Sequence, residues 1–140
     1  MSTMKDVICA THSFFEKHWC EDEEIPQWSD SWDWQSPVPN YDQAGVYALV
    51  DEDKEVVYIG VGASKGGGQY KNHGLSYRLL NHVITTDKNE RRGHYKAQDR
   101  WKDIKEIYTI GFPEGYSYMS LALEDYLIAE LQPRININKK

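Results

Sequence analysis

Two apolar segments separated by a short polar run dominate the middle of the chain. Residues 45–50 and 55–60 are rich in β-branched and aromatic side chains, and residues 51–54 between them are all charged. This pattern predicts a β-hairpin whose pairing places Tyr47 close to Tyr58. Glycines at the outer ends of both strands mark positions where the backbone bends or where a ligand approaches it closely. An ordinary edge hairpin without a ligand gives the same pattern.

The N-terminal part of the chain changes from a helical to an irregular pattern. Apolar residues at helical spacing predict a helix that begins at a cap on Ser2 or Thr3 and ends near Trp19. Its apolar face is expected to contain Val7, Ile8, Phe14 and Phe15. Residues 20–43 are acidic and contain three prolines, which predicts irregular structure. We expect their tryptophans, Trp28, Trp32 and Trp34, to anchor this segment on the domain surface; stacking on nucleobases is the alternative.

The sequence that follows the hairpin predicts helices, a third strand and an extended tail. A helix covers about residues 75–84, and the polar, basic residues 87–105 predict a loop and a short helix that ends near Trp101. Residues 104–112 predict the third strand. The strongest helical pattern covers residues 116–131. The remaining C-terminal residues are expected to be extended.

The length of 140 residues fits one compact domain and is too short for two. We therefore expect one domain over residues 44–140, preceded by a helical and acidic extension over residues 1–43. No apolar run approaches the ~18 residues that span a bilayer, so no membrane partner is expected. Cys9 and Cys20 lie outside any Cys-x-x-Cys motif and favour a reducing cytoplasm. A zinc site formed with nearby histidines would have an uncommon spacing.

Charge is unevenly distributed along the chain. The net charge of −6 argues against a nucleic-acid partner. However, residues 1–44 hold two Lys against nine Asp and Glu, whereas residues 58–105 hold ten Lys and Arg against four acidic residues. A solvated surface is the simple interpretation of such a basic run. A nucleic-acid contact is the other, through Lys65 and Lys71 in a glycine-rich loop and through Arg91, Arg92 and Lys96.

Three polar side chains of the predicted helices are candidates for chemistry. Arg78 and His82 are four residues apart and therefore share one helix face, which is expected to look toward the hairpin. From spacing alone, a solvated arginine and a buried core histidine remain the simpler interpretation. Glu124 lies beside Leu123 on an apolar helix, where an unpaired carboxylate is costly to bury. It is therefore expected either to point outward or to bind a cation.

Five segments in register resemble the GIY-YIG nuclease superfamily, over about residues 44–138. They are Gly45-Val46-Tyr47, Tyr58-Ile59-Gly60, Arg78-Leu79-Leu80-Asn81-His82, Leu123-Glu124 and Pro133-Arg134-Ile135-Asn136. The resemblance implies an α/β (α+β) domain with a small, three-stranded, mainly antiparallel sheet flanked by helices. It also implies an endonuclease that hydrolyses DNA phosphodiester bonds with one Mg²⁺ or Mn²⁺ ion per active site.

The resemblance implies that four side chains act at the scissile phosphate. Tyr47 looks like the group that activates the attacking water, with Tyr58 as its hydrogen-bonding companion. His82 looks like the group that accepts or relays the proton from Tyr47, and Arg78 like the cation that stabilises the transition state. Lowering the pKa of a tyrosine from about 10 to about 7 costs roughly 4 kcal/mol. We therefore expect transfer that is concerted with a neutral His82 or aided by the metal.

The resemblance also implies that Glu124 is the single protein ligand of the metal and that Asn136 holds the site together. One carboxylate is enough for Mg²⁺, which keeps most of its waters. A double-strand break needs two active sites and therefore a homodimer, whereas a nicking enzyme needs one. The acidic extension is expected to cover the basic surface and restrain cleavage, so that deleting residues 1–41 raises it.

The alternative function is a non-catalytic nucleic-acid-binding or protein-interaction module, for instance of a phage or mobile element. The joint presence of Tyr47, Arg78, Glu124 and Asn136 favours the nuclease, because a domain released from catalysis has no reason to keep all four. A structural protein whose acidic arm mimics DNA is a third possibility, and it rests on charge alone.

Overall fold

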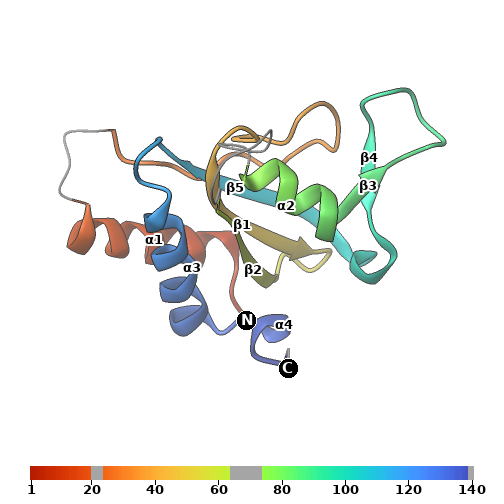
Figure 1. Ribbon diagram of the computed structural model, residues 1–140. Coiled ribbons are helices and arrows are strands. Elements are labelled where there is room, and N and C mark those ends of the chain that lie inside the picture. The colour runs from red at the N-terminus through yellow and green to blue at the C-terminus, as the bar shows by residue number, and fades with distance from the viewer. Residues whose placement is uncertain (20–23, 64–73, 139–140) are drawn as a thin grey trace.

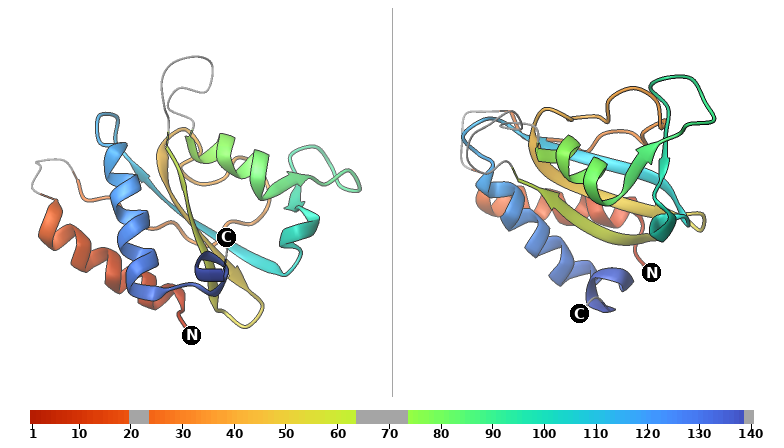
Figure 2. Two further views of the ribbon diagram at one scale, coloured as in Figure 1. Left: turned by 60° about the horizontal axis from the view of Figure 1, so that its bottom comes forward. Right: turned by 45° about the vertical axis from the view of Figure 1, so that its right-hand side comes forward.

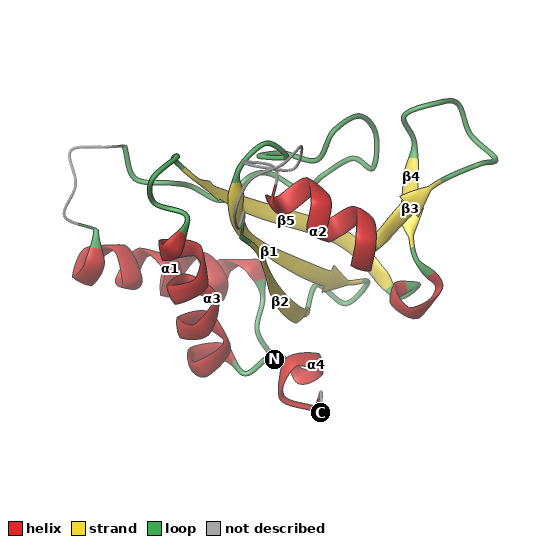
Figure 3. Ribbon diagram, in the orientation of Figure 1, coloured by secondary structure: helices red, strands yellow, loops and turns green. Residues whose placement is uncertain are grey.

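The computed structural model describes residues 1–19, 24–63 and 74–138 (Figure 1). Its elements follow one another as α1 (Met4–His18), β1 (Ala44–Asp51), β2 (Val56–Gly62), α2 (Gly74–His82), β3 (Ile84–Thr86), β4 (Tyr95–Ala97), the 3₁₀-helix η1 (Asp99–Trp101), β5 (Ile104–Phe112), α3 (Tyr118–Leu131) and α4 (Arg134–Asn138). The described chain is therefore a mixed α and β structure (Figure 3). It contains a three-stranded antiparallel sheet and a separate two-stranded sheet.

Strand β1 is the centre of the three-stranded sheet, whose order is β2-β1-β5. All eight of its residues are buried. It pairs antiparallel with β2 through the predicted hairpin and antiparallel with β5 on its other side. The segments with the highest content of β-branched and aromatic residues are thus the ones that form the sheet. The predicted hairpin and third strand are confirmed.

Successive side chains of β1 point to opposite faces of the sheet. Val46, Ala48 and Val50 belong to a core that includes residues of α1 and α3. Tyr47 and Leu49 belong to a second core that includes residues of α2. Figure 2 shows α1 and α3 on one face of the sheet and α2 on the other. The tyrosine of β1 therefore faces α2.

Helix α1 agrees with its predicted bounds and begins after a capping box at Thr3. Val7, Phe14 and Phe15 are buried on the sheet, as predicted, but Ile8 is 50% exposed. The prediction for Ile8 is wrong. At about 100° per residue, the buried side chains Val7, Thr11, Phe14 and Phe15 cover one arc of the helix, and Ile8 lies just beyond the edge of that arc. None of the helices in the described ranges has the length and apolar character needed to cross a bilayer.

Two parts of the chain differ from the prediction. Residues 84–86 and 95–97 pair as the small sheet β3–β4. The predicted helix was expected to reach residue 84 but ends at His82, and residues 95–97 were expected in the loop or short helix that follows. The tail was expected to be extended, but it forms α4 directly after Pro133. An ion pair from Arg134 to Asp51, at 3.5 Å, ties α4 to the turn of the β1–β2 hairpin. The tail is thus folded back against the sheet that carries the candidate site.

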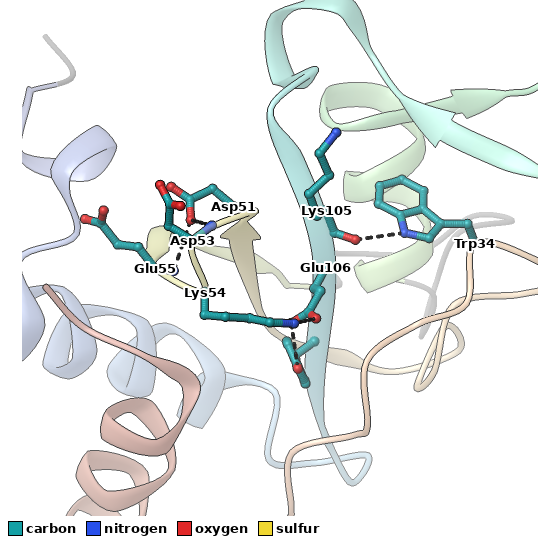
Figure 4. A network of polar contacts seen from close by, with 8 residues as sticks. Trp34, Asp51, Asp53, Lys54, Glu55, Lys105 and Glu106 are labelled. Carbon is teal, nitrogen blue, oxygen red and sulfur yellow. Dashed lines mark hydrogen bonds and ion pairs between the residues drawn. The ribbon is translucent and has the colours of Figure 1, made fainter.

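The acidic arm, residues 24–43, is held on the domain by its tryptophans. The indole of Trp28 donates a hydrogen bond to a threonine hydroxyl of α1, and Trp32 is only 5% exposed. Figure 4 shows the Trp34 indole beside β5, where its Nε1 donates to the Lys105 carbonyl at 3.2 Å. The predicted anchoring is confirmed, and the burial of Trp32 leaves no open face of that ring for a nucleobase.

Candidate active site

Four of the predicted catalytic side chains line one cavity of about 400 Å³. Tyr47 comes from β1, Tyr58 from β2, and Arg78 and His82 from α2. The hairpin and the helix are separated in the sequence, so the fold brings these groups together. The remaining lining residues are Val83, Arg100, Trp101 and Ile135.

The strand register sets the two tyrosines side by side. Tyr47 lies opposite Gly60, and Tyr58 lies opposite Leu49, so the two rings share one face of the hairpin. Their centroids are 6.2 Å apart, with an angle of 38° between the ring planes. The predicted proximity is confirmed. A Cβ atom on Gly60 would come closer than 3.0 Å to the Tyr47 ring, so the group that approaches this glycine is a side chain of the protein.

Arg78 and His82 contact each other one helical turn apart, as their spacing predicted. Nη1 of Arg78 lies 3.1 Å from Nε2 of His82. Because a guanidinium only donates hydrogen bonds, Nε2 is the acceptor, and the imidazole proton of a neutral His82 then sits on Nδ1. The lone pair that could accept a catalytic proton is therefore occupied by Arg78.

Arg78 also carries an unsatisfied donor. Its Nε is buried and has no hydrogen-bond acceptor among residues 1–19, 24–63 and 74–138. A buried donor on a charged group is costly to leave unpaired. An anion in the cavity lined by Arg78 would supply the missing acceptor, and a guanidinium suits phosphate oxygens in particular.

Tyr47 is held as a neutral phenol. Burial raises its pKa from 10.0 to about 12, and the neighbouring Tyr58 and Glu124 add to that rise. A hydrogen bond from Arg78 and its positive charge act in the opposite direction but do not outweigh burial. Removing the proton from Tyr47 at neutral pH then costs about 7 kcal/mol, since each pKa unit corresponds to about 1.4 kcal/mol. A standing phenolate is therefore absent at neutral pH.

Glu124 lies on α3, half-buried, and close enough to Tyr47 to act on its pKa. It does not line the cavity itself. The described residues contain no group of three or more His, Cys, Asp or Glu side chains placed to share a metal ion. A lone carboxylate does not fit zinc, which takes three or four protein ligands, but it fits Mg²⁺ or Mn²⁺ with most of its ligands from water and substrate.

Asn136 lies outside the cavity and fixes α4 to β2. Its Oδ1 accepts the backbone N–H of Ile59 at 2.8 Å, and its Nδ2 donates to the Ile59 carbonyl at 2.9 Å. The side chain thereby takes the place of a neighbouring strand at the edge of the sheet. It also fixes the helix that carries Ile135, a lining residue. Asn136 therefore positions the site rather than entering it.

The structure describes three of the five predicted nucleic-acid contacts. Lys65 and Lys71 lie outside the described residues. Arg91, Arg92 and Lys96 are exposed on the β3–β4 hairpin and its connecting loop, which projects from the domain beside α2 (Figure 1). Arg100 and Trp101 also line the cavity, although the sequence pattern did not predict them as site residues. The available signal was an arginine directly followed by a tryptophan within the basic segment.

Comparison with protein-family models, with curated proteins and with solved structures found no match to this chain. The resemblance to a nuclease family therefore rests on the residues named above and on their arrangement in the fold.

Proposed function

We propose that this protein is a divalent-metal-dependent endonuclease that hydrolyses DNA phosphodiester bonds, with a GIY-YIG-like fold. The observation that carries the proposal is the single cavity in which two tyrosines, Arg78 and His82 converge. Each of these groups was expected at the site because of its place in the family pattern, and three separate elements supply them. A chance resemblance gives no reason for such a convergence.

Arg78 is the group that would hold the scissile phosphate. Hydrolysis adds negative charge to the phosphate oxygens as water attacks, so a fixed cation beside them favours the transition state over the substrate. The buried Nε of Arg78 has no acceptor among the described residues, and a phosphate oxygen would satisfy it. The same contact would draw the guanidinium away from His82 and free Nε2 as a proton acceptor.

Tyr47 would act as a neutral relay. Its raised pKa opposes ionisation, so its oxygen accepts a proton from the attacking water only as its own proton passes to His82. The water oxygen forms a bond to phosphorus, the bond between phosphorus and the leaving oxygen breaks, and the leaving oxygen takes a proton from solvent. Tyr58, beside Tyr47, would help to orient that phenol.

Glu124 would hold the Mg²⁺ or Mn²⁺ ion, one per site. When bound, the ion would lower charge on the phosphate and on the leaving oxygen. The positive charge would also offset the effect of the Glu124 carboxylate, which now contributes to the high pKa of Tyr47. The carboxylate therefore has a role even before any metal contact, because its charge acts directly on the tyrosine.

The β3–β4 hairpin would carry the flanking DNA. Arg91, Arg92 and Lys96 are exposed there, and phosphate contacts of this kind supply affinity without sequence specificity. One site cuts one strand, so a double-strand break would require a homodimer. The cytoplasmic location favoured by the two cysteines stays a prediction.

Cleavage of supercoiled plasmid by the purified protein tests the proposal. Mg²⁺ or Mn²⁺ should support nicking or linearisation, and EDTA, Tyr47→Phe and Glu124→Gln should each abolish it. Cleavage that persists in EDTA and in both variants would contradict the assigned site. If the protein binds the plasmid but never cuts it with either metal, the non-catalytic binding module replaces the nuclease as the proposed function.

A further inference from the structure

The short helix η1 supplies two of the cavity's lining residues and is hydrogen-bonded to α2. The Trp101 indole Nε1 donates to the His82 carbonyl at 2.8 Å, and Nη2 of Arg100 donates to the same oxygen at 3.0 Å. That carbonyl belongs to the last residue of α2, where helix carbonyls lack partners within the helix. Arg100 and Trp101 are thus attached to the residue that carries the candidate proton acceptor.

The indole of Trp101 contacts two other side chains that line the cavity. Its ring lies 5.1 Å from the ring of Tyr58, at an angle of 55°, and the Arg100 guanidinium lies 5.6 Å from its centroid. The indole N–H is already bonded, so what Trp101 offers to a ligand in the cavity is its π surface. A fixed aromatic ring loses little conformational entropy when a ligand stacks on it.

Arg100 joins the cavity to a second hollow. It lines the 400 Å³ cavity together with Trp101, and it lines a neighbouring hollow of about 620 Å³ together with Lys88 and Lys96. Three cations and one carboxylate, that of Asp99, line that hollow, and the excess of cations suits phosphate groups. Arg100 therefore links the cavity that holds Trp101 to the lysines of the second hollow.

We infer that Trp101 and Arg100 form a nucleotide subsite, in which the base next to the scissile phosphate stacks on Trp101 and Arg100 contacts the phosphate that follows. This inference rests on the proposed function and specifies its substrate. The aromatic ring suits the base of a nucleotide, and the cations suit its phosphates. The stacking ring accepts every base, because every base has a π face.

The subsite selects nucleic acid whose bases are already unstacked. A cavity of about 400 Å³ is in the range of small-molecule sites and admits one nucleotide, not a duplex. A base inside a regular duplex must leave its stack and its partner to reach Trp101, and this costs least in single strands or distorted DNA. The favoured substrate is therefore single-stranded, branched or damaged DNA.

Binding to two matched single strands tests the subsite. One probe is an oligothymidylate, and the other is an abasic strand with the same length and the same number of phosphates. Both are measured in EDTA, so that no cleavage intervenes. The wild type should bind the thymidylate strand about 5- to 150-fold more tightly, the range expected for stacking one base on an aromatic side chain.

Three variants separate stacking from fold effects. Trp101→Leu should bind the two strands equally, whereas Trp101→Phe should retain most of the preference. Trp34→Leu is the matched control, because Trp34 also donates its indole N–H to a backbone carbonyl but lies outside the cavity. It should keep the full preference. Equal binding of both strands by the wild type, or a preference that survives in Trp101→Leu, overturns the subsite.

Metal-dependent cleavage of supercoiled plasmid and of the oligothymidylate strand, measured in parallel, keeps the two proposals apart. Metal-dependent cleavage of either substrate together with equal binding of the two strands overturns the subsite and leaves the nuclease in place. A base preference that depends on Trp101 without any cleavage supports the subsite as part of a binding module and overturns the hydrolase.

Discussion

The ring of Tyr47 lies against the backbone of Gly60 on the adjacent strand. The two residues are direct partners in the β1–β2 register, and a Cβ atom at Gly60 would overlap the phenol carbons and oxygen of Tyr47. Gly60 is therefore needed for the position of the tyrosine hydroxyl. This relationship explains a glycine inside a strand, where the residue otherwise weakens pairing and packing.

Replacing Gly60 by Ala should displace Tyr47 and reduce cleavage at least about 10-fold, since small misplacements of reacting groups are costly. Gly111→Ala is a suitable control in the same sheet. There the new methyl group would meet Gln43 and Asn40, which lie away from the cavity. The control should lose some stability but keep its cleavage rate per folded molecule. Equal rates for the two variants would show that Gly60 does not set the tyrosine position.

Stability should fall at high pH because Tyr47 is buried as a phenol. The unfolded chain loses this proton near pH 10, whereas the folded chain keeps it to about pH 12. The raised pKa therefore contributes stability below pH 10, and about 3 kcal/mol of it is lost as the pH rises through this window. Urea unfolding at a series of alkaline pH values should show a steeper fall for the wild type than for Tyr47→Phe. Parallel curves would contradict the assignment.

Asn136→Ala should release α4 from β2. It removes two hydrogen bonds to Ile59 and leaves that residue's backbone groups without their partner, which should cost about 2 kcal/mol. Amide hydrogen exchange at Ile59 should accelerate. Asn138→Ala on the same short helix is the control, because Asn138 is exposed. It should change neither the stability nor the exchange rate.

The N-terminal extension should be essential for folding. Phe14 is buried against the sheet and α3, so Phe14→Ala should lower the free energy of unfolding by about 3–5 kcal/mol. Ile8→Ala on the exposed side of the same helix should change it by less than about 0.5 kcal/mol. Chemical denaturation measures both. A Phe14 variant as stable as the wild type would mean that α1 does not contribute to the core.

The expected restraint of cleavage by the acidic extension cannot be tested by deleting the extension. Deleting residues 1–41 would remove Phe14, Phe15 and Trp32 from the two cores, so the truncated chain is expected to unfold. Asp30→Asn with Asp42→Asn removes charge at two exposed positions of the arm instead. Cleavage should rise in this double variant, and an unchanged rate would argue against restraint by the arm.

The predicted elements are those whose own residue pattern favours a strand or a helix. Strands β1, β2 and β5 are long runs of β-branched and aromatic residues, and the residues that α1 and α3 bury recur at helical spacing. Strands β3 and β4 have three residues each and pair only in the folded context. The tail alternates Ile and Asn, which resembles a strand, yet Asn136 and Arg134 hold it as a helix against the sheet.

The family pattern predicted four of the cavity's lining residues, whereas Glu124, which it also names, lies outside the cavity on α3. Tyr47, Tyr58, Arg78 and His82 share a cavity as expected. Asn136 acts from outside the cavity, through β2. The position of Trp101 follows from its bond to the carbonyl that ends α2, and a long-range contact of that kind has no signature in a single sequence.

Arg78 gives the most direct test of the proposed nuclease. Plasmid cleavage with Mg²⁺ should be measured for the wild type, Arg78→Gln and the charge-matched control Lys5→Gln, which changes an exposed residue of α1. If Arg78 holds the scissile phosphate, its variant should cleave at least about 100-fold more slowly, while the control keeps the wild-type rate and both remain folded. Cleavage by Arg78→Gln at the wild-type rate would contradict the account.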